Sequence, residues 1–261
     1  MSSTIVEPST QQVLEFCARD PVERVFLEDV ARRDLGRFSA LERADGTLGA
    51  LCHVGANIVP SGEGCGAFAP VASRGRLRMI IGEAGAVSDL WRAARGSLPA
   101  PREDRPGQPV YVIAEPPPAG GTGLRAATPG DLDRLVPACA AAHALELGVD
   151  PLERDPEGFR WRTLAQIDEG RSWLWLEDGV VRFKAEASAW TPEAVQVQQV
   201  WVDREARRHG YAARALRDLC RLLLATTPRV TLFVRRDNLP AIRLYESIGM
   251  RRALEYRSVL F

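Results

Sequence analysis

The chain has 261 residues, of which 46% are hydrophobic and 26% charged, so it is long enough for one large globular domain or two small ones. Its 34 basic and 34 acidic residues cancel to a formal net charge of +0, which gives nucleic-acid or membrane-surface binding no overall electrostatic support. No apolar run reaches the length of a membrane span, the N-terminus lacks a signal pattern, and the five cysteines and three histidines are scattered without metal-binding spacing. We therefore expect a cytoplasmic protein with reduced thiols, no metal, and no nucleic-acid or membrane partner.

The first 115 residues have the pattern of a small unit of helices and strands. Helices are expected at 9–18 and 21–33, the second begun by Asp20 as N-cap and Pro21 in the first turn. Asp45-Gly46 predicts a hairpin that joins strands at 38–43 and 48–54. The glycine-rich stretch 57–66 is interpreted as a loop, and its Glu63 disfavours a phosphate site. A strand at 78–81, a helix at 87–95 and a strand at 110–114 follow.

A linker is predicted where three prolines precede two glycines, at 115–121. The prolines stiffen this stretch and the glycines then free it. We place the domain boundary there, with a first domain at 1–115, the linker at 116–122 and a second domain at 123–261.

The second domain begins with a short strand at 124–127. A helix then starts at Thr128-Pro129-Gly130-Asp131, and Pro137 inside its apolar stripe predicts a kink. A helix at 159–168 and a hairpin of strands 173–177 and 180–190 around Asp178-Gly179 are expected next. The domain ends with strand 195–202, a helix, strand 230–234, a helix containing Tyr245, and a last strand.

The stretch 195–224 predicts a phosphate-binding turn. Alternating apolar residues at 195–202 indicate a strand, and helical spacing begins at Ala212. Between them lie Arg207, Arg208 and Gly210. The helix start offers free N–H groups and positive dipole, Gly210 lets the backbone approach, and the guanidinium groups bind phosphate oxygens.

Two motifs carry a family resemblance. Arg207-Arg208-His209-Gly210-Tyr211-Ala212 fits the acyl-CoA signature of the GNAT N-acetyltransferases, and 238–250 (NLPAIRLYESIGM) resembles their Asn-x-x-Ala-x-x-Leu-Tyr-x-x-x-Gly-Phe helix, with Met250 in place of Phe. The resemblance covers roughly 123–261. It implies an α/β fold (an α+β mixed sheet) whose central sheet is splayed, with acetyl-CoA as co-substrate. Because the first half has a similar element order, the chain resembles tandem GNATs with a degenerate N-terminal half, as in an actinobacterial branch.

The resemblance also implies site residues. The cofactor is expected to pair with the backbone of Val200, Trp201 and Val202. Its phosphates would lie on the turn, and Asn238 would also contact it. The turn residues implied are Arg207, Arg208, His209, Gly210, Tyr211, Ala212 and Ala213. Tyr245 matches the family's acid for the CoA thiolate, although a core tyrosine bonded to backbone is the alternative.

The general base is less well marked. Many GNATs carry a glutamate on the strand before the phosphate turn, but this chain has Gln196, Gln198 and Gln199 there, and an amide takes no proton. Glu186 is the candidate, on the strand face that it shares with Lys184; a plain surface ion pair is the alternative. Glu146 is a weaker substitute.

The predicted function is direct acetyl transfer from acetyl-CoA to a primary amine, on a small molecule, a peptide or a protein. The alternative is a CoA-binding regulatory or scaffold protein that has lost catalysis. The first half is expected to shape the acceptor side and to bind no second CoA. The sequence leaves the acceptor and the oligomeric state open.

Overall fold

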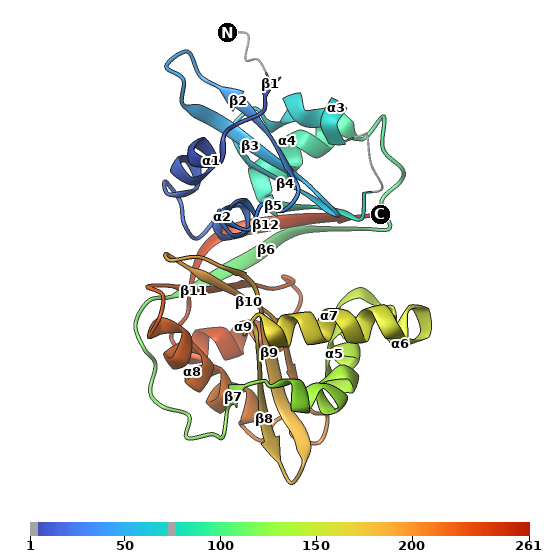
Figure 1. The fold of residues 1–261 in the computed structure, drawn as a ribbon, viewed down its shortest axis with the longest axis vertical. Coiled ribbons are helices and arrows are strands. Elements are labelled where there is room, and N and C mark those ends of the chain that lie inside the picture. The colour runs from blue at the N-terminus through green and yellow to red at the C-terminus, as the bar shows by residue number, and fades with distance from the viewer. Residues whose placement is uncertain (1–4, 73–76) are drawn as a thin grey trace.

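The computed structural model describes residues 5–72 and 77–261. Within these ranges the strands form one mixed sheet in the order β1-β2-β3-β4-β5-β12-β6-β11-β10-β9-β8-β7 (Figure 1). Its strands are β1 Ile5–Val6, β2 Arg37–Glu42, β3 Leu48–Val54, β4 Asn57–Gly62, β5 Met79–Glu83, β6 Glu103–Ile113, β7 Arg125–Ala126, β8 Ser172–Glu177, β9 Val180–Trp190, β10 Val195–Val202, β11 Val230–Phe233 and β12 Arg251–Leu260. The helices are α1 Thr10–Cys17, α2 Val25–Arg32, α3 Ala69–Ala72, α4 Ala84–Ala94, α5 Leu132–Leu147, α6 Pro151–Arg154, α7 Pro156–Asp168, α8 Tyr211–Leu224 and α9 Leu239–Ser247.

The two halves of the chain exchange their last strands. β6, which ends the first half, pairs with β11 of the second half, and β12, which ends the chain, pairs with β5 of the first. β6 and β12 also pair with each other and join the halves at the centre of the sheet (Figure 1). A cut at the linker would therefore leave β11 without β6 and β5 without β12. The halves are two structural units, but neither is complete in its own stretch of sequence.

Helices cover both faces of the sheet in the second half. α8 and α9 pack on one face, where Phe183, Ala185 and Ala187 of β9 are buried. α5 and α7 pack on the other face, over Leu174 and Val181. Within the described ranges, no helix is long and apolar enough to cross a membrane.

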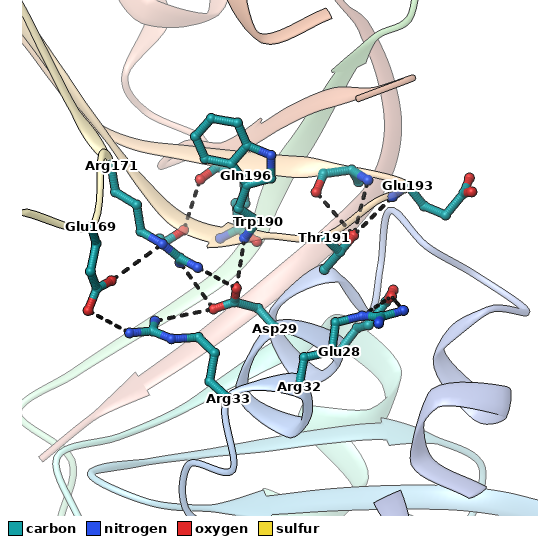
Figure 2. A network of polar contacts seen from close by, with 12 residues as sticks. Glu28, Asp29, Arg32, Arg33, Glu169, Arg171, Trp190, Thr191, Glu193 and Gln196 are labelled. Carbon is teal, nitrogen blue, oxygen red and sulfur yellow. Dashed lines mark hydrogen bonds and ion pairs between the residues drawn. The ribbon is translucent and has the colours of Figure 1, made fainter. Parts of the chain in front are cut away.

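Helix α2 of the first half docks on β9 of the second through a polar network (Figure 2). The buried Asp29 carboxylate accepts hydrogen bonds from Arg171 Nη1 and Nη2 at 3.1 and 2.6 Å and from the Trp190 backbone N–H at 3.1 Å. Arg33 lies 3.5 Å from Asp29 and 2.7 Å from Glu169. Because a buried carboxylate must be paired, this network fixes how the halves meet.

The segment between β6 and β7 runs beside α8 and is hydrogen-bonded to it (Figure 1). Its glycines had predicted a flexible end to the linker. The Asp218 carboxylate accepts from the N–H groups of Gly120 and Thr122 at 2.7 and 2.8 Å, and Arg214 Nε donates to the Gly120 carbonyl at 2.9 Å. A Cβ on Gly120 would lie 1.9 Å from the Arg214 carbonyl oxygen. Glycine here permits close backbone contact with the helix rather than motion.

The interpretation of 57–66 as a loop was wrong in its first part. Asn57–Gly62 is strand β4, which pairs with β3 and, at Asn57 and Ile58, with β5 in parallel. Pro60 and Gly62 hide the strand from sequence rules because such residues usually end strands. Its long-range pairing outweighs that local preference.

Candidate active site

Strands β10 and β11 diverge and open the sheet. Val195 and Gln196 pair in parallel with Val230 and Thr231, whereas the rest of β10 continues along β9. The backbone of Val200, Trp201 and Val202 thus borders the opening on the side away from β9. This geometry matches the splayed sheet that the resemblance implied.

A bulge at Gln199 marks the edge of this opening. The register of β10 on β9 shifts between Gln198, opposite Glu186, and Trp201, opposite Lys184. Gln199 has φ 52°, in the left-handed region that non-glycine residues rarely occupy. Such strained positions persist where surrounding contacts impose them, and they are common at functional sites. The sequence shows three glutamines on this strand but not which of them is turned out.

The turn after β10 leaves the N-terminus of α8 open. Gly210 is the N-cap residue, at φ 80°, and no side chain caps the helix. Arg207, Arg208 and His209 before it are exposed. The first N–H groups of α8, at Tyr211, Ala212 and Ala213, therefore carry the partial positive charge of an uncapped helix start beside two arginines, an arrangement suited to phosphates.

Other contacts hold this turn and helix in place. Arg182 Nη1 donates to Asp203 Oδ1 at 3.0 Å, at the start of the turn. The Tyr211 hydroxyl donates to Glu177 Oε2 at 2.5 Å, and its ring stacks on Trp175 with centroids 4.6 Å apart. The Tyr211 side chain thus anchors the helix to β8 and leaves its backbone to face the opening.

Helix α9, which follows β11, carries Tyr245. Asn238 caps this helix, its Oδ1 accepting from the Ala241 N–H at 3.3 Å, so a cofactor contact by Asn238 stays a prediction. Tyr245 is 6% exposed, and burial, with the nearby charge of Glu146, raises the pKa of its hydroxyl. Its ring lies 5.9 Å from that of Tyr111, a residue of β6. In the described part of the chain, no group accepts a hydrogen bond from the Tyr245 hydroxyl, and the side chain belongs to the buried core of the second half. The role of Tyr245 as the acid stays a prediction.

Lys184 and Glu186 form the expected pair, but beneath a helix rather than on a surface. Lys184 is 0% exposed, and its Nζ contacts Glu186 Oε1 and lies 3.5 Å from Cys139 Sγ on α5. The Cys139 thiol also donates to Glu186 Oε1, at 3.3 Å. Burial lowers the pKa of Lys184, but the opposing effects of Glu186 and Cys139 raise it above its ordinary value. The alternation along β9 identified the shared face but not the helix that covers it.

Glu146, in the last turn of α5, lies at the same site. One of its carboxylate oxygens accepts from Gln199 Nε2, at the bulge. Its backbone carbonyl accepts from Arg105 Nη2 at 3.0 Å. Glu146 retains exposed surface, yet surrounding protein raises the pKa of its carboxyl, with Arg105 and Lys184 opposing that rise.

The structure therefore gathers most of the sequence-predicted residues around one opening, and it adds two that sequence reasoning missed. Arg105 and Tyr111 reach the site from β6, a strand of the first half. No local motif marks either residue, because their placement follows from the strand exchange. His143, by contrast, packs against Phe159 with ring centroids 5.9 Å apart.

Comparison with known families gives two matches along the chain. Residues 141–250 match a model described as the acetyltransferase (GNAT) family. Residues 36–135 match one described as a domain of unknown function, DUF4081. No curated protein matches the sequence significantly.

Solved structures resemble the whole chain. A GNAT-family acetyltransferase from Colwellia psychrerythraea has 11% identity and a TM-score of 0.58 over 100% of both chains. A GCN5-related N-acetyltransferase from Sphaerobacter thermophilus has 18% identity and a TM-score of 0.60, covering 98% of this chain and 94% of that one. A tandem GNAT protein from the clavulanic acid biosynthesis pathway has 14% identity and a TM-score of 0.57, covering 99% and 98%. Residues 141–250 therefore match the GNAT acetyltransferase family, and the whole chain has the fold of these GNAT structures, among them a tandem GNAT protein.

Proposed function

We propose that the protein transfers an acetyl group from acetyl-CoA to a primary amine at the opening between β10 and β11. The observation that carries this proposal is one continuous arrangement of groups. The uncapped start of α8 follows the end of β10, and Tyr245 lies on α9, the helix that follows β11. The first can hold the phosphates of CoA and the second can protonate its sulfur.

Direct transfer needs a neutral amine, a polarised thioester and a protonated leaving group. The amine nitrogen attacks the acetyl carbonyl carbon, a C–N bond forms, and the C–S bond breaks. Tyr245 gives its hydroxyl proton to the departing thiolate and regains one from the protonated amide nitrogen. A carboxylate on the acceptor side takes the first proton from the ammonium, and Glu186 is the candidate that the sequence indicates.

The first half contributes to this site through β6. Arg105 bonds the backbone of α5 on the acceptor side, and the Tyr111 hydroxyl donates to Glu246 Oε1 on α9 at 2.9 Å. We infer that the first half supports the acceptor side and binds no CoA of its own. In the first half, β4 is followed by the short 3-10 helix Cys65–Phe68, and the N–H of Gly66 in its first turn already donates to Asp89 Oδ2 at 2.8 Å.

The test is release of free CoA thiol from acetyl-CoA in the presence of a panel of primary amines, small and peptidic. Tyr245→Phe keeps the ring and removes the hydroxyl. We expect its turnover to fall roughly 10²-fold or more, with acetyl-CoA affinity little changed. Unchanged turnover would show that Tyr245 is a core residue.

The second candidate function is a CoA-binding regulatory or scaffold protein. The absence of a glutamate from β10 favours it, as does the neutralisation of Glu186 by Lys184. This alternative predicts that acetyl-CoA raises the melting temperature while no amine releases thiol.

A further inference from the structure

Glu186 is poorly placed to take a proton. Its Oε1 already receives both the Lys184 ammonium and the Cys139 thiol, and its side chain is 14% exposed. Protonation of Glu186 would leave the fully buried Lys184 charge without a counter-ion, which is costly at a 0% exposed position. The pair therefore acts as a fixed, neutral unit under α5.

Glu146 has the contacts that Glu186 lacks. The neutral side-chain amide of Gln199 donates to the Glu146 carboxylate and orients it. Arg105 donates to the Glu146 backbone carbonyl and not to the carboxylate. In the described chain, no lysine, arginine or histidine lies within ion-pair distance of this carboxylate. Glu146 is thus a carboxylate that is held in place, partly surrounded by protein, and still free to accept a proton.

The first half contains a similar set of contacts around a glutamate, but there the carboxylate is paired with an arginine. In the first half, β4 begins its parallel pairing with β5 at Asn57, and in the second half β10 begins its parallel pairing with β11 at Val195. Ser61 and Gln199 each lie four residues after these starting points, so the two positions are equivalent. The Ser61 hydroxyl donates to Glu23 Oε2 at 3.0 Å, as Gln199 donates to Glu146. Glu23 lies in the turn between α1 and α2, whereas Glu146 lies in the last turn of α5.

The backbone contacts correspond as well. The Tyr256 hydroxyl of β12 donates to the Glu23 carbonyl at 2.6 Å, as Arg105 of β6 donates to the Glu146 carbonyl. The halves differ in one respect. Arg24 Nε lies 2.7 Å from Glu23 Oε2, and the Glu23 side chain is only 8% exposed. In the first half an internal arginine pairs with the carboxylate, whereas in the described part of the second half no cationic side chain pairs with the exposed Glu146.

We propose that Glu146 is the base of the reaction and that the ammonium group of the acceptor takes the place that Arg24 fills in the first half. This assignment rests on the proposed function. The ammonium N–H bond breaks and its proton moves to Glu146, the neutral amine attacks the thioester, and Glu146 later releases the proton to solvent. Gln199 and Arg105 hold the carboxylate for this step.

The assignment also connects the two proton-transfer groups. The negative charge of Glu146 raises the pKa of Tyr245. When Glu146 takes up the proton of the amine, that charge disappears, and Tyr245 becomes a stronger acid before the thiolate leaves. The charged groups around Glu146 are Arg105 on β6 and the Lys184–Glu186 pair on β9, and neither of these needs to change its protonation in the step.

The test compares Glu146→Gln with Glu186→Gln across pH, with Glu153→Gln on the exposed helix α6 as the matched control. We expect kcat/KM of Glu146→Gln to fall roughly 10²-fold near pH 7 and to approach the wild-type value as pH rises toward the pKa of the amine. Glu153→Gln should follow the wild type. Loss in Glu186→Gln with this pH dependence, and none in Glu146→Gln, would overturn the assignment.

A second measurement needs no acceptor. Carboxyl ¹³C NMR titration should show one glutamate signal that is missing from Glu146→Gln and that titrates above the ordinary range of about 4.3. A signal at or below that range would contradict the assignment even if the enzyme is active. A wild-type protein that binds acetyl-CoA and acetylates no amine would instead overturn the proposed function itself, and with it the role of Glu146.

Discussion

Removal of the Lys184 charge tests whether the Lys184–Glu186 pair is a structural unit. Lys184→Met keeps most of the side-chain length but leaves Glu186 with the Cys139 thiol as its remaining partner. Loss of one partner from a buried ion pair costs about 3–5 kcal/mol. For a chain of this size, each kcal/mol corresponds to about 2–4 °C in melting temperature, so we expect a decrease of about 6–20 °C.

The pH dependence gives a second readout of the same variant. In the wild type, the raised pKa of Lys184 means that its contribution is fully present below the unfolded pKa of about 10.4 and is lost as pH rises through the folded value. The wild type should therefore show no Lys184-linked change between pH 6 and 9. In Lys184→Met, the unpaired Glu186 favours its neutral form, so the deficit should shrink as pH falls toward about 4.

Urea denaturation at several pH values measures both effects. The double variant Lys184→Met/Glu186→Leu should regain much of the loss, because a neutral apolar pair leaves no buried charge. Arg160→Met is the matched control, since the Arg160–Asp133 pair is exposed and should be worth about 0–1 kcal/mol. A loss below about 1 kcal/mol in Lys184→Met, without pH dependence, would refute the reasoning.

Three further predictions concern the cofactor and the junction between the halves. Gly210→Glu should abolish the rise in melting temperature that acetyl-CoA produces. Gly210→Ala is equally strained at φ 80° but uncharged, so it should retain most of that rise. Equal shifts in the two variants would place the phosphates elsewhere. Calorimetry should give one acetyl-CoA per chain, because Asp89 occupies the start of the 3-10 helix Cys65–Phe68 after β4, and a stoichiometry of two would contradict this. Asp29→Asn should lower the free energy of unfolding by about 3 kcal/mol, because it leaves Arg171 without its carboxylate. Asp133→Asn, at an exposed position of α5, should change it little, and similar losses in both variants would argue against the buried network.

Local sequence patterns predicted those parts of the molecule that depend on neighbours in the chain. The alternation of 195–202, the turn at Gly210 and the motif around Tyr245 indicated the strand, the helix start and the family resemblance. The Asp-Gly pairs at 45–46 and 178–179 predicted two hairpins that the structure contains. In each case the physical preference acts within a few residues, so one stretch of sequence is enough.

Only the tertiary structure decided which groups meet across the sheet. No local pattern shows that β6 and β12 exchange places, because any apolar strand can pair with either half, and Arg105 enters the site only through this exchange. Period-2 alternation put Lys184 and Glu186 on one face, but the packing of α5 over that face turned a surface pair into a buried one. Glu146 likewise becomes a candidate base only in the tertiary structure, where Gln199 at the bulge bonds its carboxylate and Arg105 from the other half bonds its backbone carbonyl. Long-range pairing and burial set the charge state of these groups, and neither can be read from residue spacing alone.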